Sequence, residues 1–153
     1  MDIQYVNAFI SGLINVSGML GMSDLKRTGL NKREKLLTDK DVNIIIGLTG
    51  GLEGNVVLSM HESTARNIAS IMMGGMPVNE FDFIPRSALC ELSNMVAGNS
   101  VSSLEQLGVL VNITPPTLIN GSNLVAMISQ VETLVIDFSG TPGNIEMNVA
   151  IES

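Results

Sequence analysis

Residues 85–108, PRSALCELSNMVAGNSVSSLEQLG, form the longest stretch of this chain that can be one helix. At 100° per residue, its apolar side chains fall into a main line and a weaker line nearly opposite. The main line holds Ala88, Leu89, Leu92, Met95, Val96 and Leu107, and the second holds Cys90, Ala97, Val101 and Leu104. Because each apolar line needs a cover, we expect other elements to pack on two sides of this helix.

A narrow polar strip runs between the two apolar lines. Its members Ser87, Glu91, Asn94, Gly98 and Glu105 are spaced so that they stack along one side of the helix, with a carboxylate beside a carboxamide. A glycine in a helix interior costs about 1 kcal/mol relative to alanine. Two interpretations are open for Gly98: close packing against a neighbouring helix, or close approach of another molecule. The strip as a whole is either a solvated face or a contact surface.

Length and composition predict a single domain over residues 1–153. The mean hydropathy is +0.36, which is enough for a real core. There is no run of 18 apolar residues, and polar residues interrupt the first 21, so we expect neither a membrane span nor a signal peptide, and a cytoplasmic location. The lone Cys90 and the lone His61 are too few for an internal disulfide or a Cys/His metal site.

The charge distribution argues against nucleic-acid binding. The formal net charge is −7, and six of the eight basic residues lie between positions 26 and 40. Lysines commonly protect an exposed sheet edge, so this basic segment is interpreted as a solvated edge strand at residues 25–37. Aromatic residues make up only 3% of the chain and tryptophan is absent, so stacking on bases is not expected.

Two more helices are predicted. Residues 2–20 form the first, with Asp2 as its cap and apolar residues recurring at helical spacing. Its Gly12 and Gly18 would permit close contact with another helix. Residues 62–73 form a shorter helix that ends at Gly74-Gly75.

The remaining segments read as strands. We expect a hairpin of residues 41–48 and 55–60, and then strands at 109–113, 124–131, 133–138 and 145–151. The turn at 49–54 is rich in glycine but lacks a phosphate-loop pattern, so a plain hairpin turn is the better interpretation. The last strand alternates, with Ile145, Met147, Val149 and Ile151 on one face, and is predicted to be half-buried.

A weak internal repeat sets the expected fold class. Gly54-Asn55-Val56-Val57-Leu58 resembles Gly143-Asn144-Ile145-Glu146-Met147, and each segment closes a hairpin. Each half also opens with a long helix that carries an asparagine, Asn15 or Asn94. We therefore predict an α+β fold in which a pseudo-duplicated antiparallel or mixed sheet is packed by two long helices and one short helix.

The familiar catalytic constellations are missing from the sequence. There is no Ser-His-Asp set at a usable spacing, no nucleophile elbow, and no close acid pair beyond what a protein surface would show. His61 is expected to be a surface or capping residue rather than a general base. A carboxamide, however, donates and accepts hydrogen bonds without ionising. It can therefore hold a water molecule in line with a bond that is already activated.

The pattern Ser87-x3-Glu91-x2-Asn94, continuing as Met95-Val96-Ala97-Gly98-Asn99, resembles the signature helix of the CheX and CheC chemotaxis phosphatases. The segments DVNIIIGLTGGLEGNVVLSM, STARNIASIMMGG and LEQLGVLVNITPPTLINGS are similar to the CheX strands, short helix and post-helix segment. The likeness extends over nearly the whole chain, from about residue 6 to residue 151. E-x-x-N alone carries no information, but this order of elements makes the motif specific.

The resemblance implies dephosphorylation of the response regulator CheY. By analogy, Glu91 would pair with a lysine of the regulator and Asn94 would orient the attacking water, while Ser87 and Gly98 would lie on the partner-binding surface. The regulator would contribute Mg²⁺, so the chain is expected to need no metal or cofactor of its own. The alternative is a non-catalytic adaptor that binds a regulator, such as a flagellar-switch protein of the same fold. A third possibility is that the strip packs against a second subunit.

The sequence departs from the family pattern in two places. Pro116 stands one residue short of the spacing that the family keeps after the motif asparagine. Aligning Asn15 with Asn94 places Gly12 where Glu91 stands, so the first half lacks the acid. One motif per chain is the arrangement of CheX rather than CheC. By that likeness we expect a homodimer that is joined through its sheet and presents one site per subunit.

Overall fold

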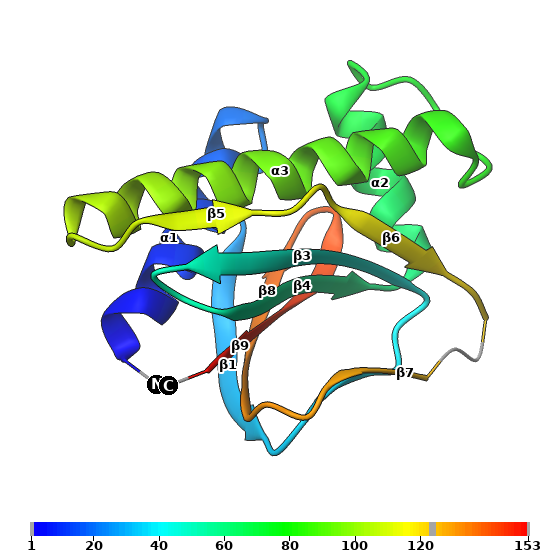
Figure 1. The fold of residues 1–153 in the computed structure, drawn as a ribbon. Helices are drawn as coiled ribbons and strands as arrows, with labels where there is room; N and C mark the ends of the chain where they lie inside the picture. The colour runs from blue at the N-terminus through cyan, green and yellow to red at the C-terminus, as the bar shows by residue number, and fades with distance from the viewer. Residues whose placement is uncertain (1, 123–124, 153) are drawn as a thin grey trace.

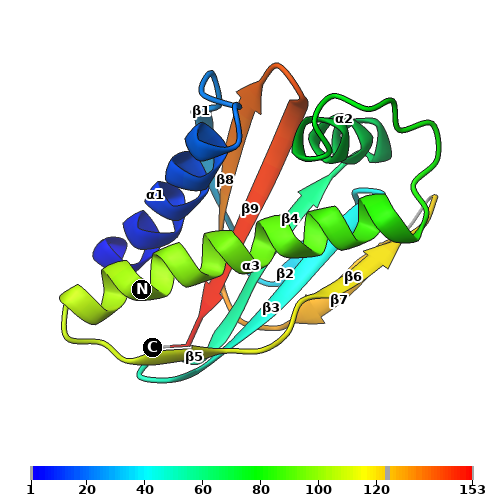
Figure 2. The same cartoon turned by 90° about the horizontal axis from the view of Figure 1, so that it is seen from above.

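The computed structural model describes residues 2–122 and 125–152 and has three layers (Figure 1). Three helices cover one face of a central sheet, and a small two-stranded sheet lies against the other face (Figures 1 and 2). The elements in chain order are α1 (Ile3–Met19), β1 (Lys26–Arg33), β2 (Leu36–Thr38), β3 (Val42–Gly50), β4 (Gly54–Met60), α2 (Glu62–Met72), α3 (Phe83–Gln106), β5 (Val111–Ile113), β6 (Thr117–Asn120), β7 (Ala126–Ser129), β8 (Thr133–Gly140) and β9 (Gly143–Ile151).

The seven-stranded central sheet confirms the predicted α+β class. Its order is β1-β8-β9-β4-β3-β5, with β6 also paired to β3, and each of these pairs is antiparallel. The two predicted hairpins, β3–β4 and β8–β9, meet through their second strands, where Val57 lies opposite Asn148. The weak sequence repeat therefore corresponds to two like units that share the middle of one sheet.

The two edges of the sheet differ from each other. The basic strand β1 forms one edge, as predicted, but it ends at Arg33, and the chain turns so that Leu36 begins β2 beneath the sheet. Leu36 is fully buried there. At the other edge β5 and β6 follow each other along β3, separated by the Pro115-Pro116 step that cannot donate to the ladder. The sequence analysis did not predict β2 or β6.

The prediction that β9 is half-buried is wrong. Besides its apolar face, Glu146, Asn148 and Ala150 on the opposite face are at most 7% exposed. The cause is the β2–β7 sheet, which covers this second face around Leu36, Val57 and Ala150. Alternation along a strand reports which face is more apolar, and here the less apolar face is covered as well.

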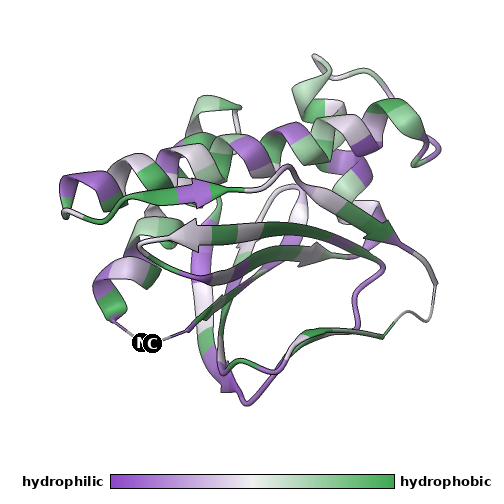
Figure 3. Cartoon of the chain, viewed as in Figure 1, coloured by the Kyte–Doolittle hydropathy of each residue, from purple (hydrophilic) through white to green (hydrophobic). Residues whose placement is uncertain are grey.

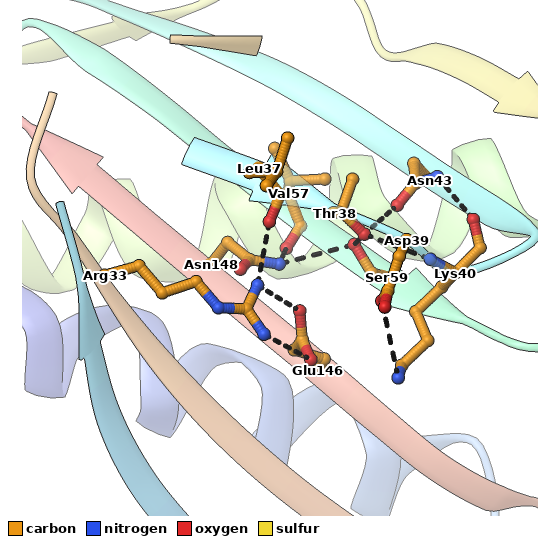
Figure 4. Close-up of polar contacts among 10 residues, drawn as sticks. All are labelled: Arg33, Leu37, Thr38, Asp39, Lys40, Asn43, Val57, Ser59, Glu146 and Asn148. Atoms are coloured by element: carbon orange, nitrogen blue, oxygen red, sulfur yellow. Dashed lines mark hydrogen bonds and ion pairs between the residues drawn. The ribbon is translucent and has the colours of Figure 1, made fainter. Parts of the chain in front are cut away.

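Most polar groups on that covered face bond to one another, although Asn148 Oδ1 has no hydrogen-bond partner within the described residues (Figure 4). The Thr38 hydroxyl donates to Asn43 Oδ1 at 2.8 Å, and Asn148 Nδ2 donates to Ser59 Oγ at 3.3 Å. An ion pair of 3.2 Å joins the Arg33 guanidinium to Glu146. Burial of these polar groups is tolerated because most of their hydrogen-bonding capacity is used.

Helix α1 packs directly against α3. The Asp2 side chain caps α1 by accepting from the Gln4 amide at 2.9 Å, as predicted. A Cβ on Gly12 would lie 2.9 Å from the Val96 carbonyl oxygen, so this glycine does permit close helix contact. Gly18 does not, because a Cβ there would meet nothing within 4 Å. Within the described residues, no helix is long and apolar enough to cross a membrane.

Candidate functional site

The polar strip of α3 faces solvent along its length. Ser87, Glu91, Asn94 and Gly98 are all exposed. The opposite face is buried and holds Leu89, Leu92, Ser93, Val96, Ala97, Ser100 and Leu104. Figure 2 shows α3 crossing above the sheet with α1 and α2 beside it, which leaves its outer side uncovered. A rigid helix therefore presents the strip outward.

The burial of α3 corrects one prediction. The two apolar lines do not lie on opposite sides of the helix. Instead Leu89 and Val96 from the main line and Leu104 from the second line share one broad buried face. Leu107, assigned to the main line, follows the end of the helix and is 49% exposed. Polar and apolar residues alternate along the α3 ribbon, which is why the sequence did not define a single buried face (Figure 3).

Glu91 and Asn94 lie almost one helical turn apart on the exposed strip. This spacing places their Cβ atoms about 5–6 Å from each other on the same side of the helix. The carboxylate can accept hydrogen bonds from a cation, and the neighbouring carboxamide can both donate and accept. Together they can bind a positively charged group and orient a small polar molecule beside it.

Gly98 lies one turn beyond Asn94, and a Cβ added to it would meet nothing within 4 Å. The interpretation that this glycine allows close packing with a neighbouring helix is therefore wrong. Its backbone is open to solvent instead, so an approaching molecule could come unusually close at this position. Gly12 of α1 is the opposite case, because there a neighbouring helix already occupies the space.

Side chains next to the pair are poor nucleophiles. Ser93 precedes Asn94 but is buried, and its hydroxyl makes no hydrogen bond within the described part of the chain. Cys90 precedes Glu91 and is half-buried, and burial raises the pKa of its thiol. A thiol with a raised pKa stays protonated near neutral pH and reacts slowly. The site is thus better suited to positioning another reactant than to forming a covalent intermediate.

His61 is not part of the strip. It occupies the residue before α2, as predicted, but its side chain makes no capping hydrogen bond. Its Nδ1 lies 3.7 Å from Asp41 Oδ2, and the ring borders a cavity of about 370 Å³ that also contacts β8 and β9. Among residues 2–122 and 125–152 no group of three or more His, Cys, Asp or Glu side chains could hold a metal ion.

Phe83 and Ile84 are exposed residues that lie just outside the helix predicted at residues 85–108. They form the first two positions of α3, and their side chains are 80% and 61% exposed. The signal that could have located them is Asp82, a residue type favoured at the N-cap, directly before them. Pro85 then falls in the first turn, where its missing N–H does no harm.

Comparison with known proteins places the chain in a family. The family model described as "Chemotaxis phosphatase CheX" matches residues 42–139. A protein from Thermotoga maritima named "CheY-P phosphatase CheX" is 39% identical over 131 residues, which cover 81% of this chain and 80% of that protein. The chain belongs to the CheX family. The match with the family model includes all of α3 and therefore the whole polar strip.

Solved structures agree with this CheX-family assignment. A CheC-like superfamily protein from Shewanella sp. PV-4 has a TM-score of 0.89 at 24% identity and covers 100% of both chains, which supports the fold. A crystal structure of a CheX–CheY–BeF₃–Mg²⁺ complex from Borrelia burgdorferi has a TM-score of 0.84 at 29% identity, covering 97% of this chain and 98% of that one. The predicted CheC-like fold is confirmed.

Proposed function

We propose that this chain is a phosphatase that accelerates hydrolysis of the aspartyl phosphate on a CheY-like response regulator. The observation that carries the proposal is the exposure of Glu91 and Asn94 side by side on α3 of a CheX-family fold. The Thermotoga relative is named for CheY-P phosphatase activity, and the Borrelia structure contains a CheX–CheY complex. Both facts support a receiver domain as the partner.

Asn94 would act by holding the attacking water. Its carboxamide can accept a hydrogen bond from the water while its NH₂ group contacts the phosphoryl region. The water oxygen then forms a bond to phosphorus, the bond between phosphorus and the aspartyl oxygen breaks, and its electron pair returns to the regulator's carboxylate. The water proton ends on phosphate or solvent. Such catalysis depends mainly on positioning, because the acyl phosphate is already activated.

Glu91 would secure the partner next to the reacting group. A carboxylate on an exposed helix can pair with a lysine of the regulator, which would set the register of Asn94 against the phosphate. Ser87 and Gly98 continue the same strip and would contact the partner's loops. The charge on the transferred phosphoryl group would be neutralised by Mg²⁺ on the regulator. The chain's own α3 holds only Glu91 and Glu105 as acids, which lie about 21 Å apart along the axis.

Two further expectations belong to this proposal. Response regulators of this kind act inside the cell, so the chain would work in the cytoplasm. A homodimer joined through the sheet stays a prediction, and it is compatible with the proposal because α3 lies on a face of the sheet rather than at its edge. Light scattering of the purified protein would measure the oligomeric state.

The proposal is tested by mixing the chain with phosphorylated receiver domains from the same cell and following phosphate loss. We expect faster loss from at least one receiver with the wild-type chain, and no acceleration with Asn94→Ala. A matched control is Asn7→Ala, since Asn7 is also an exposed asparagine on a helix, and it should behave like wild type. Binding to a receiver without any faster phosphate release would reject the enzyme in favour of an adaptor.

A further inference from the structure

Phe83 is an unusual residue for the surface of this chain. The other three phenylalanines, Phe9, Phe81 and Phe138, are at most 5% exposed, whereas Phe83 is 80% exposed. It is the most exposed of the large hydrophobic side chains in the described residues, and Ile84 beside it is 61% exposed. Leaving a large aromatic ring in water is unfavourable, so this position is a candidate for contact with another molecule.

Phe83 lies on the same side of α3 as the catalytic pair. Eleven residues separate it from Asn94, which is three turns plus about 20° of rotation and about 16 Å along the axis. Ile84 lies seven residues before Glu91, which is two turns less about 20° of rotation and about 10 Å along the axis. A standard interface covers about 800 Å² on each partner, a patch about 30 Å across. One docked partner can therefore contact Phe83 and Ile84 at the same time as Glu91 and Asn94.

A shallow cavity of about 180 Å³ adjoins the start of α3. Ile84 lines it together with Met73, Pro77 and Val78 from the end of α2 and the following loop. Its remaining lining includes the acidic residues Glu80 and Asp82. A hollow lined by apolar side chains and two carboxylates fits the side of a partner that presents apolar groups next to lysine or arginine.

The charges on this face point to the same kind of partner. From Ser87 to the end of α3 there is no lysine or arginine, while Glu91 and Glu105 are both exposed. The one basic residue of α3 is Arg86, whose guanidinium lies 5.9 Å from the centre of the buried Phe81 ring. The outer side of α3 is thus acidic with an apolar end, and it complements a receiver domain whose lysine pairs with Glu91.

We propose that Phe83 and Ile84 form an apolar anchor that docks the phosphorylated receiver domain at the start of α3. The anchor rests on the proposed function, since its occupant is the same regulator that meets Glu91 and Asn94. It is a binding element rather than a catalytic one, because its distance from Asn94 keeps it away from the reacting phosphate. Central aromatic side chains commonly supply a large share of interface affinity.

If Phe83 is an anchor, its removal should weaken binding of the receiver without changing the rate of the chemical step. Phe83→Ala should raise the dissociation constant for the receiver loaded with BeF₃ and Mg²⁺ by at least about tenfold. At saturating chain concentration the rate of phosphate release should stay within about twofold of wild type, because interactions that hold substrate and transition state equally affect KM and not kcat. Phe83→Trp should retain tight binding.

Leu110→Ala is the matched control. Leu110 is 69% exposed but follows the far end of α3, so its truncation should change neither binding nor the saturated rate. Circular dichroism and the thermal midpoint should be unchanged in both alanine variants, since each side chain is mostly in water.

Three outcomes would overturn the anchor. The first is an unchanged dissociation constant for Phe83→Ala while the wild-type chain still accelerates phosphate release, which rejects the anchor and keeps the proposed function. The second is a change in oligomeric state by light scattering, which assigns Phe83 to a contact between two copies of the chain. The third is a wild-type chain that neither binds nor dephosphorylates any receiver, which removes the proposed function and the anchor with it.

Discussion

Helices α1 and α3 occupy equivalent places in the two halves of this fold, yet they treat the same motif positions in opposite ways. Aligning Asn15 with Asn94 places Gly12 at the position of Glu91 and Ala8 at that of Ser87. In α1, Ala8 and Gly12 are buried. In α3, the corresponding Ser87 and Glu91 are exposed.

The two asparagines are both exposed, but they differ in their contacts. Asn15 Nδ2 donates to Asn99 Oδ1 of α3 at 3.4 Å, so this carboxamide is used within the molecule. Asn94 projects from the outer side of α3. The comparison teaches that a duplicated element can keep its place in the sheet-and-helix framework while one copy is used for packing and the other for binding.

Introducing the missing acid into α1 would test this contrast with the largest effect. Gly12→Glu should lower the free energy of unfolding by at least about 3 kcal/mol, because the new side chain meets the Val96 carbonyl and would bury a charge between two helices. Urea denaturation of the purified variant measures the loss. Gly18→Glu is the control, since Gly18 is exposed with no neighbour within 4 Å of its Cβ, and its effect should stay below about 1 kcal/mol. A Gly12→Glu protein as stable as wild type would show that α1 is not committed to packing.

Removing the charge of Glu91 in α3 should have the next largest effect. Glu91→Gln should reduce kcat/KM for the phosphorylated receiver by about 10- to 100-fold, because the amide keeps the shape but loses the charge that pairs with lysine. Stability should stay within about 0.5 kcal/mol of wild type, since the side chain is exposed. Steady-state phosphate release measures the first quantity and thermal denaturation the second. Glu105→Gln, on the same strip but about 21 Å away, is the control. An equal loss in both variants would indicate a general effect of charge.

Gly98→Ala sharpens the comparison because stability and function should move in opposite directions. A Cβ at this position meets nothing within 4 Å, so alanine should stabilise the protein by about 0.5–1 kcal/mol through its higher helix propensity. The same Cβ should weaken receiver binding several-fold if the partner approaches the α3 backbone here. Thermal midpoint and fluorescence anisotropy give the two values. Unchanged affinity would remove Gly98 from the contact surface.

The smallest expected effect concerns a link between the start of β1 and the β8–β9 turn. Asp24 accepts hydrogen bonds from the Thr141 hydroxyl and from its amide, the latter at 2.8 Å, and the hydroxyl contact chiefly lowers the pKa of Asp24. The unfolded chain then binds the proton more readily than the folded one. The resulting stabilisation is present above the ordinary pKa of 3.8 and is lost as the pH falls through the lowered value.

Asp24→Asn should therefore make the free energy of unfolding fall less steeply as the pH is lowered into the acid range. Denaturation between about pH 2.5 and pH 6 measures it, and the wild-type and variant curves should converge toward the acid end. Thr141→Val should reproduce the change, because it removes the hydroxyl donor. Identical slopes for wild type and both variants would exclude the link.

The sequence predicted an element of the fold correctly where its apolar, polar and turn residues followed a clear pattern. Helix α1 was found because its apolar residues have helical spacing and Asp2 caps it. The two hairpins were found because glycine-rich turns separate β-branched runs. The burial of Glu146 and Asn148 was missed because polar residues on a strand suggest solvent. Only the folded chain brings Arg33 and Ser59 to them.

The candidate site was likewise predicted only in part. Spacing alone predicted that Ser87, Glu91, Asn94 and Gly98 share one line along the helix, and the structure shows that this line is exposed. Their roles in binding and catalysis stay predictions, since exposure is necessary for either role but does not establish it. Phe83 and Ile84 were missed because the start of the helix was placed at Pro85, two residues late.

Whether Asn94 orients the attacking water is tested most directly by the rate of phosphate release within a fully formed complex. The phosphorylated receiver would be mixed with saturating Asn94→Ala chain, with saturation confirmed by anisotropy, and a single turnover followed. The account predicts the rate of the receiver alone, because the bound variant lacks the group that orients water. A single-turnover rate equal to that of the wild-type complex would contradict it.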